Sequence, residues 1–222
     1  MPNTAHAATI AHERAEPDAL VHADLRFRNL VSADDWGQLP AAVRRRFSKR
    51  LAGGRTAVYT GSIVETAMSR TGMAIAQLAR LIGGPLPTSR DIGVPSVVTV
   101  TEDMATGGQI WTRLYARRAG FPQVIHSSKR FSGETGLEEH VGWGIGMSLR
   151  LAIAPDALLF TSARYFWQAG RLRVHLPHWL TPGALTVGHH DLGDGRFAFT
   201  LDIVHPWFGT LIHQRAEFRE LP

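Results

Sequence analysis

The sequence of 222 residues contains no cysteine. This absence excludes a disulfide framework, thiolate zinc sites and a cysteine nucleophile, and it is typical of the reducing cytoplasm, where we expect the protein to reside. The sequence also lacks the run of ~20 apolar residues that a bilayer-spanning helix needs, so we expect no integral membrane association. Glu13, Glu16 and Asp18 interrupt the first twenty positions, which excludes the apolar core of a secretory signal.

Lysine is scarce, since only Lys49 and Lys129 accompany the arginines that give the chain a formal net charge of +5. The densest basic run is Arg44–Arg46, followed by Lys49 and Arg50. A phosphate-binding or anionic-membrane patch is one interpretation of this run. We favour a solvated helix face, because the run lacks the series of aromatic side chains on which bases stack. Nucleic acid is therefore not an expected partner.

No phosphate-binding loop, dinucleotide fingerprint, serine-hydrolase elbow or zinc-protease helix is present. The glycine-rich segment 142–146 runs into a strand pattern, which favours glycines that let a strand bend. Histidines and two aspartates raise the question of a metal: His175, His178, His189, His190, His205, His213, Asp191 and Asp202. Adjacent strand residues such as His189 and His190 point to opposite faces, so we expect neither a metal site nor a cofactor.

Short helices are predicted in the first half of the chain. Ser32, followed by acidic residues, is typical of a helix start, and Pro40 is predicted to begin a second helix that runs to about Arg50. A third helix is indicated by apolar residues at helical spacing, namely Ile75, Leu78, Ala79 and Ile82. We expect its apolar stripe to cover an open barrel end or a sheet face.

Strands dominate the sequence after position 95, and the β-branched content of residues 55–67 predicts one more. From Gly146 onward, large apolar residues alternate with polar ones, as in a strand with one buried face. The apolar face consists of Met147, Leu149, Leu151 and Ile153. Turn residues such as Gly193-Asp194-Gly195 join successive strands closely, which predicts an antiparallel meander.

A twisted sheet of roughly nine or ten strands closes or splits in two, and a closed barrel of this size leaves room for one small ligand. The predicted fold is mainly β: an antiparallel, calycin- or lipocalin-like β-barrel with short N-terminal helices and one covering helix. An α+β helix-grip fold is the alternative, but it needs a long C-terminal helix where this sequence has a strand pattern. Residues 1–20 are interpreted as a disordered leader and residues 21–222 as one barrel domain. The proline-rich segment 177–183 is expected to cross a barrel end as a loop or single turn.

Several short motifs occur in an order that resembles an uncharacterised bacterial family, domain-of-unknown-function family 4166. The motifs are Leu39–Arg44, Tyr59–Glu65, Trp111–Arg113, Glu138–Gly142, Leu176–Pro182, Gly195–Phe197 and Pro206–Gly209. Members of this family often follow a saccharopine-dehydrogenase-like reductase module. The resemblance implies a single domain that acts alone or with a separate partner, and it brings no catalytic residue with it.

Candidate site residues come from strand faces rather than from a motif. If the apolar face that begins at Met147 continues backward without a bulge, Glu139 points into the barrel with Val141 and Trp143. We expect burial to raise the pKa of the Glu139 carboxyl, so that it acts as a general acid or base near neutral pH.

Arg113 lies between Trp111 and Tyr115, on a predicted strand of aromatic character. Its guanidinium could pair with Glu139 or bind a carboxylate, carbonyl or enolate of a ligand. A structural ion pair that closes the barrel is the alternative. The predicted site consists of Arg113 and Glu139 as catalytic residues, and of Trp111, Tyr115, Trp143, Tyr165 and His213 as substrate-binding residues.

Together these patterns predict a protein that holds a small hydrophobic molecule, of polyketide or isoprenoid type, in a barrel cavity. The expected catalytic form is a cofactor-free cyclase or isomerase, in which the barrel orients a flexible substrate. A non-catalytic carrier of a lipid or metabolite is one alternative, and a docking domain for a separate reductase is another. We also consider a homodimer possible from the sequence.

Overall fold

The computed structural model describes residues 24–220, and the expected leader lies outside them. Three short helices come first: η1 (Arg28–Leu30), α2 (Ala33–Gln38) and α3 (Ala41–Phe47). The predicted start of α2 is confirmed, because the Ser32 hydroxyl accepts a hydrogen bond from the Asp35 amide at 3.0 Å. The predicted second helix is present as α3, but Pro40 is its N-cap rather than its first residue, and the helix already ends at Phe47.

The basic run that begins in α3 forms a solvated face only in part: Arg45, Lys49 and Arg50 are exposed, as the sequence indicated, but Arg46 is not. Arg46 is buried, and its guanidinium carbon lies 3.7 Å from the centre of the Phe197 ring. Such stacking lets an arginine be buried against apolar side chains. One arginine of the run is thus part of the core, while Arg45 remains exposed.

Eleven strands follow in the described part of the chain. They are β1 (Thr56–Met68), β2 (Pro95–Asp103), β3 (Gly108–Tyr115), β4 (Gln123–Arg130), β5 (Glu138–Gly142), β6 (Ile145–Ala154), β7 (Ala157–Ala169), β8 (Leu172–His175), β9 (Ala184–Gly193), β10 (Arg196–His205) and β11 (Gly209–Glu220).

Ten of these strands form a closed antiparallel barrel, which confirms the predicted fold class. The hydrogen-bonded order is β6-β5-β4-β3-β2-β1-β11-β10-β9-β7, and pairing of β6 with β7 closes the ring. Strand β8 pairs with β7 outside this ring. The helix-grip alternative is wrong, because the described chain ends in β11, which pairs with β1, rather than in a helix.

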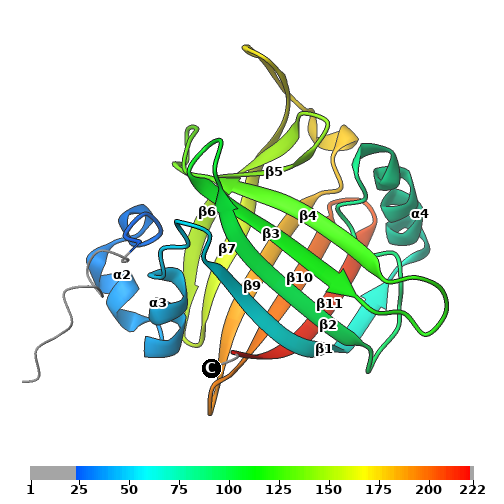
Figure 1. Ribbon diagram of the computed structural model, residues 1–222. Coiled ribbons are helices and arrows are strands. Elements are labelled where there is room, and N and C mark those ends of the chain that lie inside the picture. Colours follow the sequence, from blue (N-terminus) through cyan, green and yellow to red (C-terminus); the bar gives the residue numbers. More distant parts are fainter. Residues whose placement is uncertain (1–23, 221–222) are drawn as a thin grey trace, which may run out of the picture.

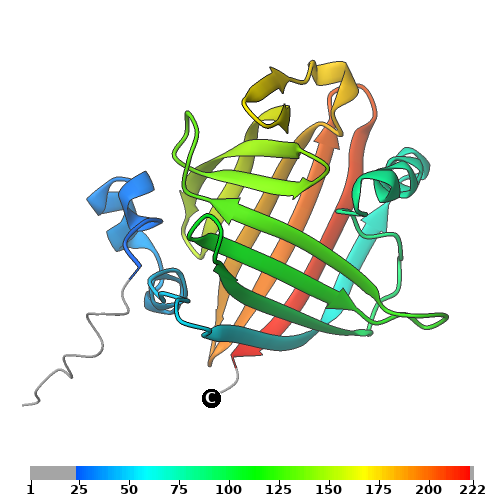
Figure 2. The same ribbon diagram turned by 45° about the horizontal axis from the view of Figure 1, so that its top comes forward.

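The helices lie at opposite ends of the barrel (Figures 1 and 2). Helices α2 and α3 lie at one end, where Phe47 packs edge-on against His189 with ring centres 4.7 Å apart. Phe47 also contacts Phe160 at 5.5 Å and Phe27 at 5.2 Å. These aromatic side chains fill the end of the barrel next to α3.

The other end carries a segment between β1 and β2 that contains α4 (Arg70–Leu78) and η2 (Ala79–Ile82). The predicted third helix is confirmed and begins earlier than its apolar stripe, because the Ser69 hydroxyl caps it by accepting from the Gly72 amide at 3.0 Å. Gly72 allows close packing, since a side chain there would overlap the Leu211 carbonyl of β11. The proline-rich segment forms η3 (His178–Leu180), a single turn at the same end, as expected.

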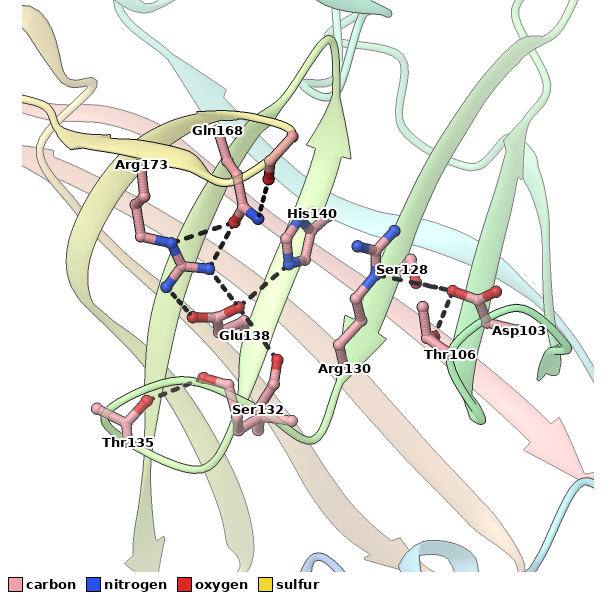
Figure 3. A network of polar contacts seen from close by, with 12 residues as sticks. Asp103, Thr106, Ser128, Arg130, Ser132, Thr135, Glu138, His140, Gln168 and Arg173 are labelled. Atoms are coloured by element: carbon pink, nitrogen blue, oxygen red, sulfur yellow. Dashed lines mark hydrogen bonds and ion pairs between the residues drawn. The ribbon is translucent and has the colours of Figure 1, made fainter.

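A polar network on the outside of the barrel holds β8 against β5 (Figure 3). Arg173 of β8 donates to both carboxylate oxygens of Glu138, at 2.6 and 3.0 Å, and to the Gln168 side chain at 2.7 Å. Ser132 and His140 complete the network at 3.2 and 3.3 Å from Glu138 Oε2. Glu138 is therefore a structural residue of the outer wall.

Candidate functional site

The interior of the barrel contains a cavity of about 730 Å³. This volume lies within the usual range for small-molecule sites, which are mostly apolar and carry few polar groups. The apolar wall includes Val98, Trp111, Ile125, Met147, Val187 and Leu201. The cavity therefore suits a ligand that is largely apolar.

The apolar side chains predicted along one face of the third helix line this cavity. Ile75 and Leu78 of α4 and Ala79 and Ile82 of η2 all contribute to the wall. The contacts of the segment explain its position: Ser69 donates its amide to Leu211 O of β11, and the Gln123 side chain of β4 donates to Leu86 O. The helix thus covers part of an open barrel end, which was one of its two expected positions.

The mouth of the cavity has an apolar rim. Trp179 and Leu180 of η3 line the cavity, yet they are 66% and 58% exposed. Leu78 and Phe208 also line the cavity, although they are 66% and 56% exposed. Large exposed apolar side chains around an opening are characteristic of an entrance for an apolar molecule or of an interaction surface.

Four neighbouring strands place one side chain each in a row across the inner wall. Lys129 of β4 is opposite Glu139 of β5, Glu139 is opposite Met147 of β6, and Met147 is opposite Tyr165 of β7. Directly opposed residues share a face of the sheet. This register confirms that Glu139 lies on the inner face with Met147.

Three charged side chains form an ion cluster in this wall, namely Arg113, Lys129 and Glu139. Lys129 Nζ lies 3.2 Å from Glu139 Oε2, and Arg113 Nη2 lies 3.7 Å from Glu139 Oε1. Arg113 also donates to the Ser127 hydroxyl at 3.1 Å. The predicted pairing of Arg113 with Glu139 is confirmed, and both residues line the cavity.

The pKa of Glu139 is lowered, which contradicts the expectation of a raised value. Burial alone would raise it, but the charges of Lys129 and Arg113 and a hydrogen bond with Ser127 outweigh the effect of burial. An opposite charge within a few ångströms favours the ionised carboxylate. Glu139 is therefore an anion near neutral pH and not a proton donor.

Lys129 is absent from the residues predicted for the site, although the sequence contains a signal for it. Lys129 is one of two lysines in an arginine-rich chain, and on β4 it shares strand parity with the buried Ile125. Its side chain is 1% exposed, and Nζ lies 4.9 Å from the centre of the Trp111 ring. Burial lowers the pKa of Lys129, Arg113 lowers it further, and Glu139 opposes both.

His189 was considered only as a metal ligand, but it lines the cavity beside Trp111 and Phe199. Its ring centre lies 5.5 Å from that of Trp111 and 4.2 Å from that of Phe199. Burial, followed by the charges of Lys129 and Arg46, holds its pKa well below the ordinary value, so the imidazole is neutral. Its Nδ1 is buried and has no hydrogen-bond partner among the described residues.

Tyr165 carries a second buried polar atom at the cavity. Burial raises its pKa to about 12, and its hydroxyl has no hydrogen-bond partner of normal geometry in residues 24–220. The nearby Ser162 hydroxyl opposes this shift, but it does not lie in hydrogen-bonding geometry with the Tyr165 oxygen. The Tyr165 hydroxyl is thus available to donate to a ligand.

Trp111, Tyr115 and Tyr165 line the cavity together with Arg113 and Glu139. Tyr115 remains protonated near neutral pH, because burial raises the pKa of its hydroxyl. The charge of Arg113 opposes this shift but does not reverse it. The structure therefore brings five of the seven predicted site residues to one cavity. Their roles in binding and catalysis stay predictions.

Trp143 and His213 lie elsewhere. The inward orientation expected for Trp143 is wrong: the register shifts between His140 and Gly142, and Trp143 occupies the following turn at φ 52° and 77% exposure. His213 faces outward from β11, where its Nδ1 lies 2.6 Å from Asp202 Oδ1. Neither residue lines the main cavity.

The expected separation of His189 and His190 is confirmed. His189 points into the barrel, whereas His190 points outward with Nδ1 3.0 Å from Asp156 Oδ2. Residues 24–220 contain no group of three or more histidine or acidic side chains placed to hold a metal ion. Within the same range, none of the helices has the length and apolar character needed to cross a bilayer.

The protein is thus a closed, ten-stranded antiparallel barrel with an internal, mainly apolar cavity. The chain belongs to the family described as Domain of unknown function (DUF4166), whose model matches residues 39–218. The predicted family is therefore confirmed, while its association with a saccharopine-dehydrogenase-like module stays a prediction. No curated protein and no solved structure matches the chain.

Proposed function

We propose that the barrel binds one small, largely apolar molecule in its cavity. The observation that supports this most strongly is the cavity itself: about 730 Å³ of space, enclosed mainly by apolar side chains and bordered by the exposed Trp179 and Leu180. Burial of an apolar ligand there is favourable by roughly 25 cal/mol per Å² of apolar surface removed from water. A polyketide- or isoprenoid-like compound fits this description.

The docking-domain alternative calls for a barrel whose interior is filled by side chains. The cavity argues against that arrangement, so we rank binding of a small molecule above docking on a separate reductase. The proposed cytoplasmic location rests on the cysteine-free sequence.

A cofactor-free cyclase or isomerase is the second candidate function. The observation that favours it is the presence of Arg113 and the unpartnered Tyr165 hydroxyl at an otherwise apolar wall. Arg113 would polarise a carbonyl or stabilise an enolate, and the cavity would hold a flexible substrate in a reactive conformation. Because Glu139 is ionised, its role would be to orient Arg113 rather than to donate a proton.

Native mass spectrometry of the purified protein, followed by denaturing extraction, tests the proposed binding. We expect an apolar compound in stoichiometric amount, or its uptake from a panel of hydrophobic metabolites. The matched variants are Val187→Trp, which fills the cavity, and Val204→Trp, which adds the same bulk at an exposed position of β10. Val187→Trp should abolish binding and Val204→Trp should preserve it, with thermal unfolding used to confirm that both are folded.

A clean mass for the unliganded protein, together with no uptake from the panel, would contradict the proposal and favour the docking alternative. Catalysis is distinguished from carriage by the product. If Arg113→Ala abolishes turnover of a bound compound while most binding survives, the protein is an enzyme; if the extracted compound is never converted, it is a carrier.

A further inference from the structure

The charges of the ion cluster do not cancel. Arg113 and Lys129 both contact Glu139, so two cationic side chains share one carboxylate. All three side chains are largely buried in the wall, with exposures of 17% for Arg113, 1% for Lys129 and 7% for Glu139. An uncompensated charge in an apolar interior is unfavourable unless a counter-charge or hydrogen bonds accompany it. The cluster therefore has the composition of a site for one further anion.

The positive potential extends to His189, deeper in the barrel beside Phe47. Lys129, Arg46 and Arg113 all act on this imidazole in the direction that opposes its protonation, in addition to burial. Among the described residues, Glu139 is the acidic side chain in contact with Arg113 and Lys129. The inner wall around the cluster is thus electropositive.

Uncharged donors accompany the cluster. The Tyr165 hydroxyl is close enough to Glu139 for that charge to affect its pKa, and it makes no hydrogen bond of normal geometry in the described chain. The neutral His189 ring has one donor and one acceptor nitrogen, and its Nδ1 is equally unpartnered. Buried polar atoms without partners are rare in native proteins, and a bound ligand is one reason for them.

We infer that the ligand is an amphipathic acid, with one carboxylate or enolate oxygen held at Arg113 and its apolar body extending toward the rim at Trp179 and Leu180. This inference rests on the proposed function and specifies its ligand class. Arg113 is suited to the role because it lines the cavity and keeps guanidinium protons beyond those directed at Ser127 and Glu139. A small inorganic anion such as chloride would satisfy the charge but would leave the apolar walls without a partner.

Equilibrium dialysis with two matched probes, dodecanoate and 1-dodecanol, tests the inference on the intact protein. We expect dodecanoate to bind about tenfold or more tightly than dodecanol, as a charge-assisted hydrogen bond in a dry site provides. Arg113→Met should remove most of this preference and change dodecanol binding by less than about threefold. Arg150→Met makes the same substitution at an exposed position of β6 and should keep the preference.

Each outcome of the dialysis has a distinct meaning. If dodecanol binds as tightly as dodecanoate, the inferred ligand class is wrong while the proposed apolar site stands. If neither probe binds, the proposed function itself fails. If chloride binds the cluster as tightly as dodecanoate does, the apolar body contributes nothing to affinity and the inference of an amphipathic ligand is overturned.

A measurement on the unmodified protein covers the case in which Arg113→Met does not fold. Dodecanoate labelled at its carboxyl carbon is titrated with acid in the bound state and followed by NMR. An electropositive site should lower the pKa of the bound carboxyl below that of the free acid. A pKa above that of the free acid would show that the carboxyl lies away from Arg113 and would overturn the inference.

Discussion

Glu138 and Glu139 are consecutive residues of β5, and their carboxylates serve opposite faces of the barrel wall. Glu138 accepts two hydrogen bonds from Arg173 on the outside, whereas Glu139 pairs with Lys129 and Arg113 on the inside. Burial would raise the pKa of both, and in both cases the cationic partners reverse that effect. Because side chains alternate between the two faces of a strand, Glu138 stabilises the outer wall while Glu139 belongs to the candidate site.

Glu138→Gln should lower the free energy of unfolding by about 1–3 kcal/mol, because it removes a buried carboxylate that holds Arg173, Ser132 and His140. Urea unfolding followed by circular dichroism measures this change. The control is Glu134→Gln, since the Glu134 side chain is 71% exposed at 3.8 Å from Arg164 and its loss should cost less than about 0.5 kcal/mol. Equal effects of the two substitutions would contradict a structural role for Glu138.

Lys129→Met should lower the free energy of unfolding by about 1–3 kcal/mol, because Glu139 Oε2 would lose its partner at 3.2 Å and remain buried without it. Lys49→Met makes the same substitution at the other lysine, which is exposed, and should change stability little. Thermal and urea unfolding of both variants give the comparison. A Lys129→Met protein as stable as the parent would show that the cluster contributes nothing to the fold.

Gly72→Ala should loosen the contact between α4 and β11, because the added methyl group would overlap the Leu211 carbonyl. We expect a loss of about 1–3 kcal/mol, as for other overpacked contacts. Gly37→Ala is the matched control: nothing lies within 4 Å of its added atom, and α2 should gain up to about 1 kcal/mol in helix propensity. Hydrogen exchange of the α4 amides should increase only in Gly72→Ala.

His213 should make the stability of the protein depend on pH. A hydrogen bond with Asp202 raises its pKa above 6.5, although burial opposes this shift. The imidazolium is therefore favoured in the folded state, and its contribution is complete below pH 6.5 and lost as the pH rises through the folded pKa. His213→Gln should remove this part of the pH dependence, measured as the difference in unfolding free energy between variant and parent across that range. A difference that grows with rising pH would contradict the assignment.

The barrel could be predicted from the sequence because strand alternation and turn glycines are local signals. Met147 and Leu149 fix the inner face of β6, and the inward position of Glu139 on β5 follows from it. The same extrapolation fails at Trp143, two residues before Ile145, because Trp143 lies in the turn that follows the register shift between His140 and Gly142. A bulge has no signal in a single sequence beyond the glycines that permit it.

The electrostatic character of the site could not be predicted, since it depends on pairs that are distant in the chain. Burial of Glu139 was correctly expected, but the direction of its pKa shift is set by Lys129 on another strand. His213 was ambiguous for a different reason. Leu211 and Ile212 are both buried where β11 contacts α4, so the usual contrast between the two faces is absent.

The pairing of β1 with β11 has a consequence for how the protein folds. Thr60 lies opposite Arg219, so this pairing joins the first and the last strand of the described chain, whereas most other neighbours in the ring are hairpins. Contacts of such high sequence separation raise the contact order and slow folding, because loop-closure entropy is lost before they form. Until β11 is in place, β1 and β10 each present an unpaired edge able to add strands of other chains. Folding yield and aggregation during refolding should therefore depend more on β11 than on any other strand of the barrel.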